Sequence, residues 1–219
     1  MHAKDYLAVC FADLELVPSI YHRWHTGMHI ALGGDSHQLL DNDQLNMDLF
    51  HLVYHQALTI FRHLFDSDDE LYLAANLYKG KRGRIKKTNL FRPFIRRKKL
   101  LYQIRAHTLP YPFEDESLFE YQQFSLKCRP ADIRIPALLK AACNKDFPPL
   151  KPRFKAHAGY PDIFFINKSK DIIFFIYDDR GCEVVAKEPA ALESLSSRLS
   201  GYTYDIKTRD EQLPVHLNR

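Results

Sequence analysis

The 219-residue chain has few of the residues that mark specialised structural classes. Eight glycines and twelve prolines are too few for a collagenous or disordered chain, because 46% of the residues are hydrophobic. The four cysteines, at positions 10, 128, 143 and 182, show no close pairing and are too few for a disulfide scaffold. We therefore expect a globular protein with reduced, mostly buried thiols that have no metal or redox role.

Long apolar runs are also missing. The run Ile172–Tyr177 is far shorter than the roughly 18 residues that a membrane-spanning helix needs. Lys4, Asp5 and Asp13 interrupt the N-terminal region where a signal peptide would have to stay apolar. We expect no membrane partner and a cytoplasmic location.

Acidic residues are absent from one part of the chain. The formal net charge is +4, but residues 79–105 contain twelve basic side chains and no acidic one, which leaves a net charge of −8 on the remainder. The twelve are Lys79, Lys81, Arg82, Arg84, Lys86, Lys87, Arg92, Arg96, Arg97, Lys98, Lys99 and Arg105. Such a concentration of like charge indicates a segment that stays in water or meets a polyanion.

Aromatic residues are interleaved with these charges, and they suggest one kind of ligand. Phe91, Phe94 and Tyr102 could stack on unpaired bases while the cations contact phosphates. If about six residues neutralise phosphates, log affinity should fall against log salt with a slope of roughly −4 to −5. The alternatives are the acidic face of a protein partner, or a solvated loop without a partner.

Hydrophobic periodicity predicts an α+β fold with a mainly antiparallel sheet. The clearest helix is 43–65, where apolar residues recur three and four positions apart, and the clearest sheet unit is a three-stranded meander over 162–186. The meander strands are Ile163–Ile166, Ile172–Tyr177 and Cys182–Ala186. Other expected helices are 4–12, 89–99, 132–146 and 189–199; other expected strands are 21–32, 71–78 and 119–128.

Three segments have a less regular pattern. Residues 79–88 predict a flexible loop, and residues 202–219 a polar tail. Residues 100–109 fit a continuing helix or a strand, and their alternation slightly favours the strand. We expect one domain over 1–219 with a basic excursion at 79–99, and a subdivision near 148–158 is left open.

The segment Asp178-Asp179-Arg180-Gly181-Cys182 combines carboxylates, a guanidinium and a thiol, which could bind a metal or a phosphate or activate the thiol. The simpler interpretation is a tight turn between two strands. Gly181 would supply a positive φ, Asp178 would bond its own backbone, and Arg180 would pair with either aspartate.

Histidine pairs and the remaining motifs give no positive sign of catalysis. His51 and His55 lie one helical turn apart, and His25 and His29 lie on one face of the expected strand, but no third ligand stands at a matching offset. Gly33-Gly34 matches no phosphate-binding loop. We predict no catalytic residue, no metal and no cofactor.

The run Phe174 to Ala186 (FFIYDDRGCEVVA) resembles the signature of a bacterial family, the domain of unknown function 3885. The resemblance extends to Pro18-Ser19-Ile20-Tyr21 with Trp24 and Gly27, to Leu64-Phe65-Asp66, and to Leu138-Leu139-Lys140-Ala141, so nearly the whole chain is covered. The resemblance implies a bacterial cytosolic protein, and it brings with it no established activity, cofactor or catalytic residue.

These observations favour a non-catalytic binding protein whose basic segment contacts RNA, DNA or an acidic partner. An alternative is an immunity protein that neutralises a secreted bacterial toxin by direct binding, since charge complementarity suits an inhibitor. A weaker alternative is a hydrolase or nuclease built on the turn at 178–182.

Overall fold

The computed structural model describes residues 2–80, 90–112, 119–154 and 160–207. Within these residues, eight strands form one antiparallel sheet in the order β3-β4-β2-β5-β6-β7-β1-β8. The strands are β1 (Gly27–Ala31), β2 (Leu71–Gly80), β3 (Arg105–Pro110), β4 (Phe119–Cys128), β5 (Asp162–Asn167), β6 (Ile172–Asp178), β7 (Gly181–Ala186) and β8 (Tyr204–Lys207). The predicted α+β class with an antiparallel sheet is confirmed.

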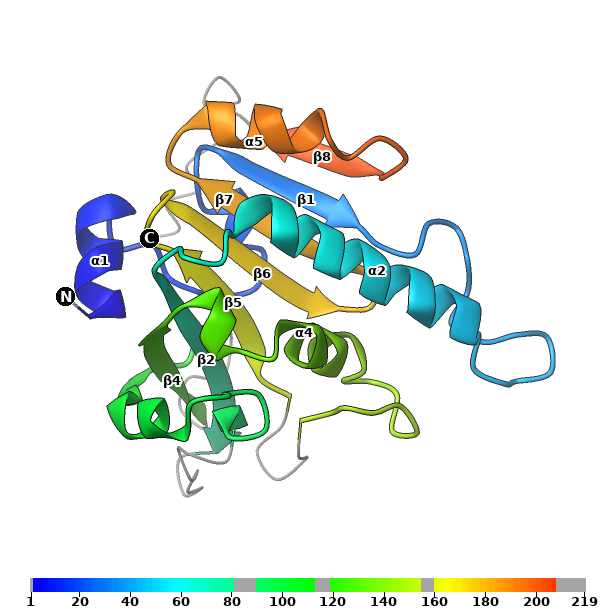
Figure 1. Cartoon of the computed structure of the whole chain (residues 1–219), viewed down its shortest axis with the longest axis horizontal. Coiled ribbons are helices and arrows are strands. Elements are labelled where there is room, and N and C mark those ends of the chain that lie inside the picture. The colour runs from blue at the N-terminus through cyan, green and yellow to red at the C-terminus, as the bar shows by residue number, and fades with distance from the viewer. Residues whose placement is uncertain (1, 81–89, 113–118, 155–159, 208–219) are drawn as a thin grey trace.

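Helices cover both faces of this sheet. The α-helices are α1 (Ala3–Cys10), α2 (Met47–Leu64), α4 (Ile135–Cys143) and α5 (Pro189–Ser196), and the 3₁₀ helices are η1 (Ile20–His22), η2 (Lys98–Gln103) and η3 (Pro130–Asp132). Figure 1 shows α2 lying across the sheet on the viewer's side, with α4 beside it and α5 near β8. Helix α1 packs on the opposite face, because its Tyr6 and Leu7 share a core cluster with Tyr72 and Phe164.

Helix α2 forms where the sequence places its apolar stripe. Phe50, Val53, Ala57 and Ile60 are fully buried, which matches the predicted spacing. The helix begins at Met47 because the Asn46 side chain accepts a hydrogen bond from the Leu49 amide at 3.2 Å. The predicted start at 43 was too early, since residues 39 and 45 pair in a short β-bridge before the helix.

The meander of β5, β6 and β7 follows the prediction closely. Its strands are buried on both faces, which explains why they appear in the sequence as continuous apolar runs. Alternate residues divide between two cores: Phe165 and Phe174 face α2, whereas Phe164 and Phe175 face α1.

Two other predictions were wrong in detail, and a third segment had two alternatives left open. The strand expected over 21–32 is only β1, because residues 20–22 turn in η1 before it. Residues 92–97 form turns and one bridge, Ile95 with Ile133, instead of a helix over 89–99. Residues 100–109 divide between η2 and β3, so both alternatives left open there are partly correct.

The polar tail contains a strand that the sequence did not suggest. Residues 204–207 form β8 and pair with β1 in register, Met28 opposite Ile206. Tyr204 and Ile206 pack against the main core, while the Lys207 ammonium donates to the His22 carbonyl at 2.9 Å. Only two apolar residues in this short strand contribute, which is too little for a periodicity signal.

Candidate nucleic-acid interface

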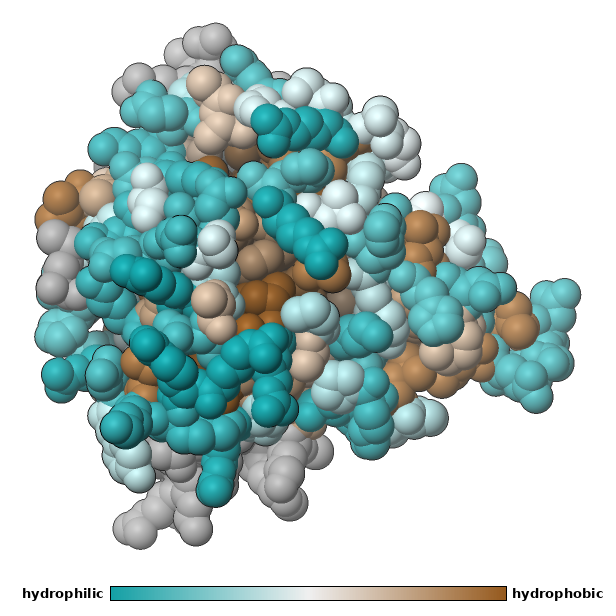
Figure 2. All heavy atoms as spheres, in the orientation of Figure 1, coloured by the Kyte–Doolittle hydropathy of each residue, from teal (hydrophilic) through white to brown (hydrophobic). Residues whose placement is uncertain are grey.

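The described part of the basic segment forms one exposed surface, which we call the basic surface. It consists of Arg92, Arg96, Arg97, Lys98, Lys99 and Arg105, whose side chains are all exposed. It runs from the turn after Phe91 through η2 to the start of the edge strand β3. In Figure 2, strongly hydrophilic side chains gather over the region that this green segment occupies in Figure 1. Lys79 and Gly80 end β2, and Lys81, Arg82, Arg84, Lys86 and Lys87 lie outside the described residues.

Apolar residues hold this surface in place. Phe91 and Phe94 are 0% and 2% exposed, and the Phe94 ring lies 5.3 Å from that of Phe154. The prediction that these two rings stack on bases is therefore wrong, because the core uses both. Tyr102, by contrast, is 89% exposed.

Several cations of the basic surface also bind the scaffold. The Lys98 ammonium donates to the carbonyls of Arg92 and Ile95 at 2.5 and 2.6 Å. Arg97 forms an ion pair with Asp132 at 2.7 Å. Among the described residues, no ion pair involves the side chains of Arg92, Lys99 or Arg105. These three cations are the ones most available to a ligand.

A hollow of about 360 Å³ adjoins the basic surface, and we call it the edge hollow. It is lined by His2, Ala3, Tyr72, Tyr102, Gln103, Arg105, Ser125 and Lys127, with no carboxylate among them. Strand register explains why the cations converge. Arg105 on β3 lies opposite Ser125 on β4, and Lys127 is two residues further along β4, so all three point to the α1 face.

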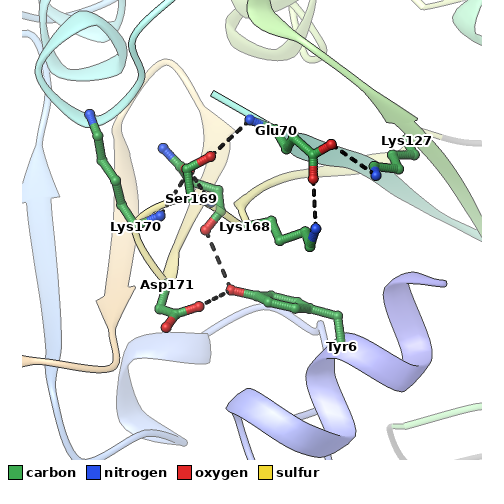
Figure 3. A network of polar contacts seen from close by, with 8 residues as sticks. Tyr6, Glu70, Lys127, Lys168, Ser169, Lys170 and Asp171 are labelled. Atoms are coloured by element: carbon green, nitrogen blue, oxygen red, sulfur yellow. Dashed lines mark hydrogen bonds and ion pairs between the residues drawn. The ribbon is translucent and has the colours of Figure 1, made fainter. Parts of the chain in front are cut away.

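Lys127 belongs to a polar network at the nearby end of the sheet. Glu70 accepts from Lys127 at 3.0 Å and from Lys168 at 2.6 Å, as Figure 3 shows. The two ammonium groups lower the pKa of Glu70 to about 2 through hydrogen bonding. The network thus keeps a net positive charge beside the edge hollow.

Sequence reasoning found Tyr102 and Arg105 but missed Lys127, Ser125 and Tyr72. These three lie in strands that the sequence did predict, with apolar residues between them. Only the pairing of β4 with β2 and β3 brings them beside η2, and that register carries no local sequence signal. A charge count along the chain could not identify them.

The turn at 178–182 is a built part of the scaffold. The Asp178 carboxylate accepts from the Arg180 amide at 2.8 Å and from its Nε at 3.1 Å, so Arg180 pairs with Asp178. Asp179 accepts from the Gln38 amide at 3.0 Å, and burial raises its pKa. The two aspartates are 1% and 4% exposed, and Cys182 is fully buried with a raised pKa, which gives no accessible nucleophile.

Gly181 is required for a different reason than expected. It has no positive φ; instead, a Cβ atom there would collide with the Tyr177 hydroxyl and lie 2.8 Å from the Ile30 carbonyl oxygen. The Tyr177 side chain thus crosses over Gly181, and its hydroxyl lies 3.0 Å from His29 Nε2. Close packing, and not turn geometry, selects glycine here.

The two histidine pairs considered in the sequence lie in different surroundings. His51 and His55 are exposed on α2, whereas His29 contacts Tyr177 within the sheet. The described residues contain no group of three His, Cys, Asp or Glu side chains that could hold a metal ion. In the same part of the chain, no helix has the length and apolar character to cross a membrane.

Comparison with known proteins agrees with the resemblance seen in the signature motif. A family model described as "Domain of unknown function (DUF3885)" matches residues 3–206. The chain is 45% identical over 212 residues to "Uncharacterized protein YnaE" of Bacillus subtilis (strain 168), covering 94% of this chain and 99% of that protein. No solved structure matches.

Proposed function

The chain belongs to the DUF3885 family, whose description names no activity, and from its surface we propose that it is a non-catalytic protein that binds nucleic acid. The basic surface supplies the contacts to phosphate. One observation carries this proposal: six apolar residues of the segment are buried while the six cations of the basic surface remain in solvent. A merely solvated loop would not need six apolar anchors, which are Phe91, Phe94, Ile95, Leu100, Leu101 and Ile104.

The scaffold fixes part of the basic surface in place beside the cations that are most available to phosphate. Lys98 is held by two carbonyl groups and Arg97 by Asp132, so part of the side-chain entropy is lost before any ligand arrives. Like charges held together in this way repel each other, and a polyanion relieves that repulsion.

Salt dependence provides the test. Binding of a short single-stranded RNA, followed by fluorescence anisotropy between about 50 and about 200 mM salt, should give a log–log slope of roughly −4 to −5. The Arg92→Gln/Lys99→Gln variant should have a slope shallower by about 1.4, because each phosphate contact on a single strand contributes about 0.7.

A matched control removes the same charge elsewhere. Arg62 and Arg198 are exposed and lie outside the basic surface, so Arg62→Gln/Arg198→Gln should keep the wild-type slope. Equal slopes in the two double variants would refute the proposed contact surface. Replacing Lys81, Arg82, Arg84, Lys86 and Lys87 with Gln should abolish binding.

A second candidate is binding to the acidic face of a protein, including a toxin that this chain would neutralise as an immunity protein. The burial of Phe91 and Phe94 favours it, because it removes two of the three rings that would stack on bases. Pull-down before and after nuclease treatment separates the two candidates. A partner that survives nuclease and is encoded next to this gene, as a large secreted protein with a variable C-terminal domain, would favour the second.

A further inference from the structure

We propose that the edge hollow is a binding site for one nucleotide, with its phosphate between Arg105 and Lys127 and its base on Tyr102. The inference rests on the proposed function where the nucleotide belongs to a strand, but the same chemistry also admits a free nucleoside monophosphate. The edge hollow shares Arg105 with the basic surface, and its other lining residues extend onto the α1 face of β2, β3 and β4.

The charge of the hollow selects an anion. Three residues of its lining carry or can carry a positive charge, His2, Arg105 and Lys127, and no lining residue is acidic. The two other described hollows differ, because Asp13 and Glu15 line one and Glu188 lines the other. Of the three, only the edge hollow therefore attracts phosphate without an opposing carboxylate in its wall.

The strand register sets the spacing of the side chains that would bind the phosphate. Arg105 and Lys127 are diagonal neighbours across β3 and β4, at a Cα separation of about 7–8 Å that long side chains can bridge. The Ser125 hydroxyl lies between them on the same face and can donate a further hydrogen bond. Lys127 forms an ion pair with Glu70. If the Lys127 ammonium turns to a ligand, Lys168 still neutralises the Glu70 carboxylate.

The aromatic residues that line the hollow favour a nucleotide over other anions. Tyr102 is 89% exposed, and stacking on a base would cover its ring. Tyr72, which is 2% exposed, closes the back of the hollow. A volume of about 360 Å³ lies at the lower end of small-molecule sites, enough for one nucleotide and too little for a duplex.

The test uses adenosine 5′-monophosphate and a short single-stranded RNA as separate probes in calorimetric titrations. Wild-type protein should bind the mononucleotide with a Kd at or below about 1 mM. Tyr102→Ala should weaken binding at least about fivefold through lost stacking. Lys127→Gln should weaken it about tenfold through the lost charged hydrogen bond.

Lys168→Gln is the matched control for Lys127→Gln. Each variant removes one of the two ammonium groups that bind Glu70, but only Lys127 lines the hollow. Lys168→Gln should therefore weaken mononucleotide binding clearly less than Lys127→Gln, because it affects the phosphate only indirectly, through the charge of Glu70. Equal losses in the two lysine variants would overturn the proposal, since they would reflect the Glu70 network alone.

The two probes separate this inference from the proposed function. RNA binding that depends on Arg92 and Lys99 but is unchanged by Tyr102→Ala and Lys127→Gln would overturn the nucleotide site and leave the proposed function standing. Mononucleotide binding that depends on Tyr102 and Lys127, without RNA binding, would support the site and refute the proposed function. Absence of binding to both probes would refute both.

Discussion

Glu183 shows how one buried carboxylate ties a helix to the sheet. It lies on β7, is 5% exposed, and accepts a hydrogen bond from the Tyr21 amide in η1 at 3.3 Å. Burial raises its pKa from 4.5 to about 7, although backbone hydrogen bonds from residues 19–21 act in the opposite direction. The position thus fixes η1 at the expense of stability whenever the carboxylate is ionised.

Replacing Glu183 with Gln should change how stability depends on pH. Between about 4.5 and 7 the unfolded chain loses this proton while the folded protein keeps it, so wild-type stability falls as pH rises. Above about pH 7 the penalty is complete and amounts to about 3 kcal/mol. Glu183→Gln removes this contribution. Urea unfolding should therefore show that the free energy of unfolding falls less between pH 5 and pH 8 in this variant than in the wild type.

Glu188→Gln serves as the control, because Glu188 is exposed. This substitution should leave the difference in unfolding free energy between pH 5 and pH 8 at its wild-type value. If Glu183→Gln lost as much stability between the two pH values as the wild type, the carboxylate would not be the source of that loss.

At the scale of elements, the turn between β5 and β6 joins three parts of the fold. The Asn167 amide donates to the Leu64 carbonyl at 2.9 Å and to the Asp69 carboxylate at 2.7 Å. Its side-chain oxygen accepts from the backbone amide of Ser169 at 2.9 Å. Tyr6 of α1 bonds Asp171 in the same turn, as Figure 3 shows. The end of α2, the meander and α1 therefore meet at one turn.

Asn167→Ala should destabilise the protein by about 2–4 kcal/mol, because Asn167 is fully buried and its loss leaves several polar groups without partners. Ser169→Ala is the control, since the exposed Ser169 hydroxyl accepts one bond, from the Glu70 amide at 3.0 Å, and its loss should cost less than about 1 kcal/mol. Urea denaturation measures both values. A similar small effect in the two variants would show that the turn does not depend on Asn167.

Elements with a strong period were predictable, and those fixed by distant contacts were not. The meander and α2 follow from apolar runs and from a stripe at helical spacing. Residues 92–97 bend away from a helix because Phe91 and Phe94 reach the core and Ile95 pairs with Ile133. β8 forms because β1 offers an open edge, which the sequence of the tail does not indicate.

The candidate site divides in the same way. Charge counting located the basic surface, and Tyr102, one of the three rings predicted to stack on bases, is exposed. Phe94 packs against Phe154, which lies far along the chain, and Phe91 is buried in the same core cluster. Lys127 enters the edge hollow only through strand register. Local sequence therefore gives the charge of the site, and tertiary pairing gives its shape.

At the scale of the whole molecule, the positive and negative charges are distributed differently over the fold. The −8 of the remainder is spread over many elements, whereas the basic residues lie in one stretch of sequence, and its described part is a short surface beside the sheet edge. Its anchors belong to the same core cluster as α2 and α4. Binding of a ligand to the basic surface should therefore stabilise the whole fold and not a detached loop.

The thiols report the integrity of that core. Cys128, Cys143 and Cys182 are 6%, 0% and 0% exposed, and burial raises the pKa of Cys128 to about 12 and those of the other two as well. Cys10 is partly exposed at the end of α1 and lines a hollow with Trp24. A thiol reagent should thus reach Cys10 readily and the three buried cysteines only poorly.

A thiol-specific disulfide reagent at pH 8 should modify one cysteine rapidly in the folded protein and all four in denaturant. The remaining three should react at the rate at which the core opens, because thiolate forms there only when water enters. Cys10→Ser should remove the fast phase and leave the slow phase unchanged. Rapid reaction of any thiol in that variant would contradict this expectation, because it would mean that β4, α4 or β7, which carry the other three cysteines, opens without global unfolding.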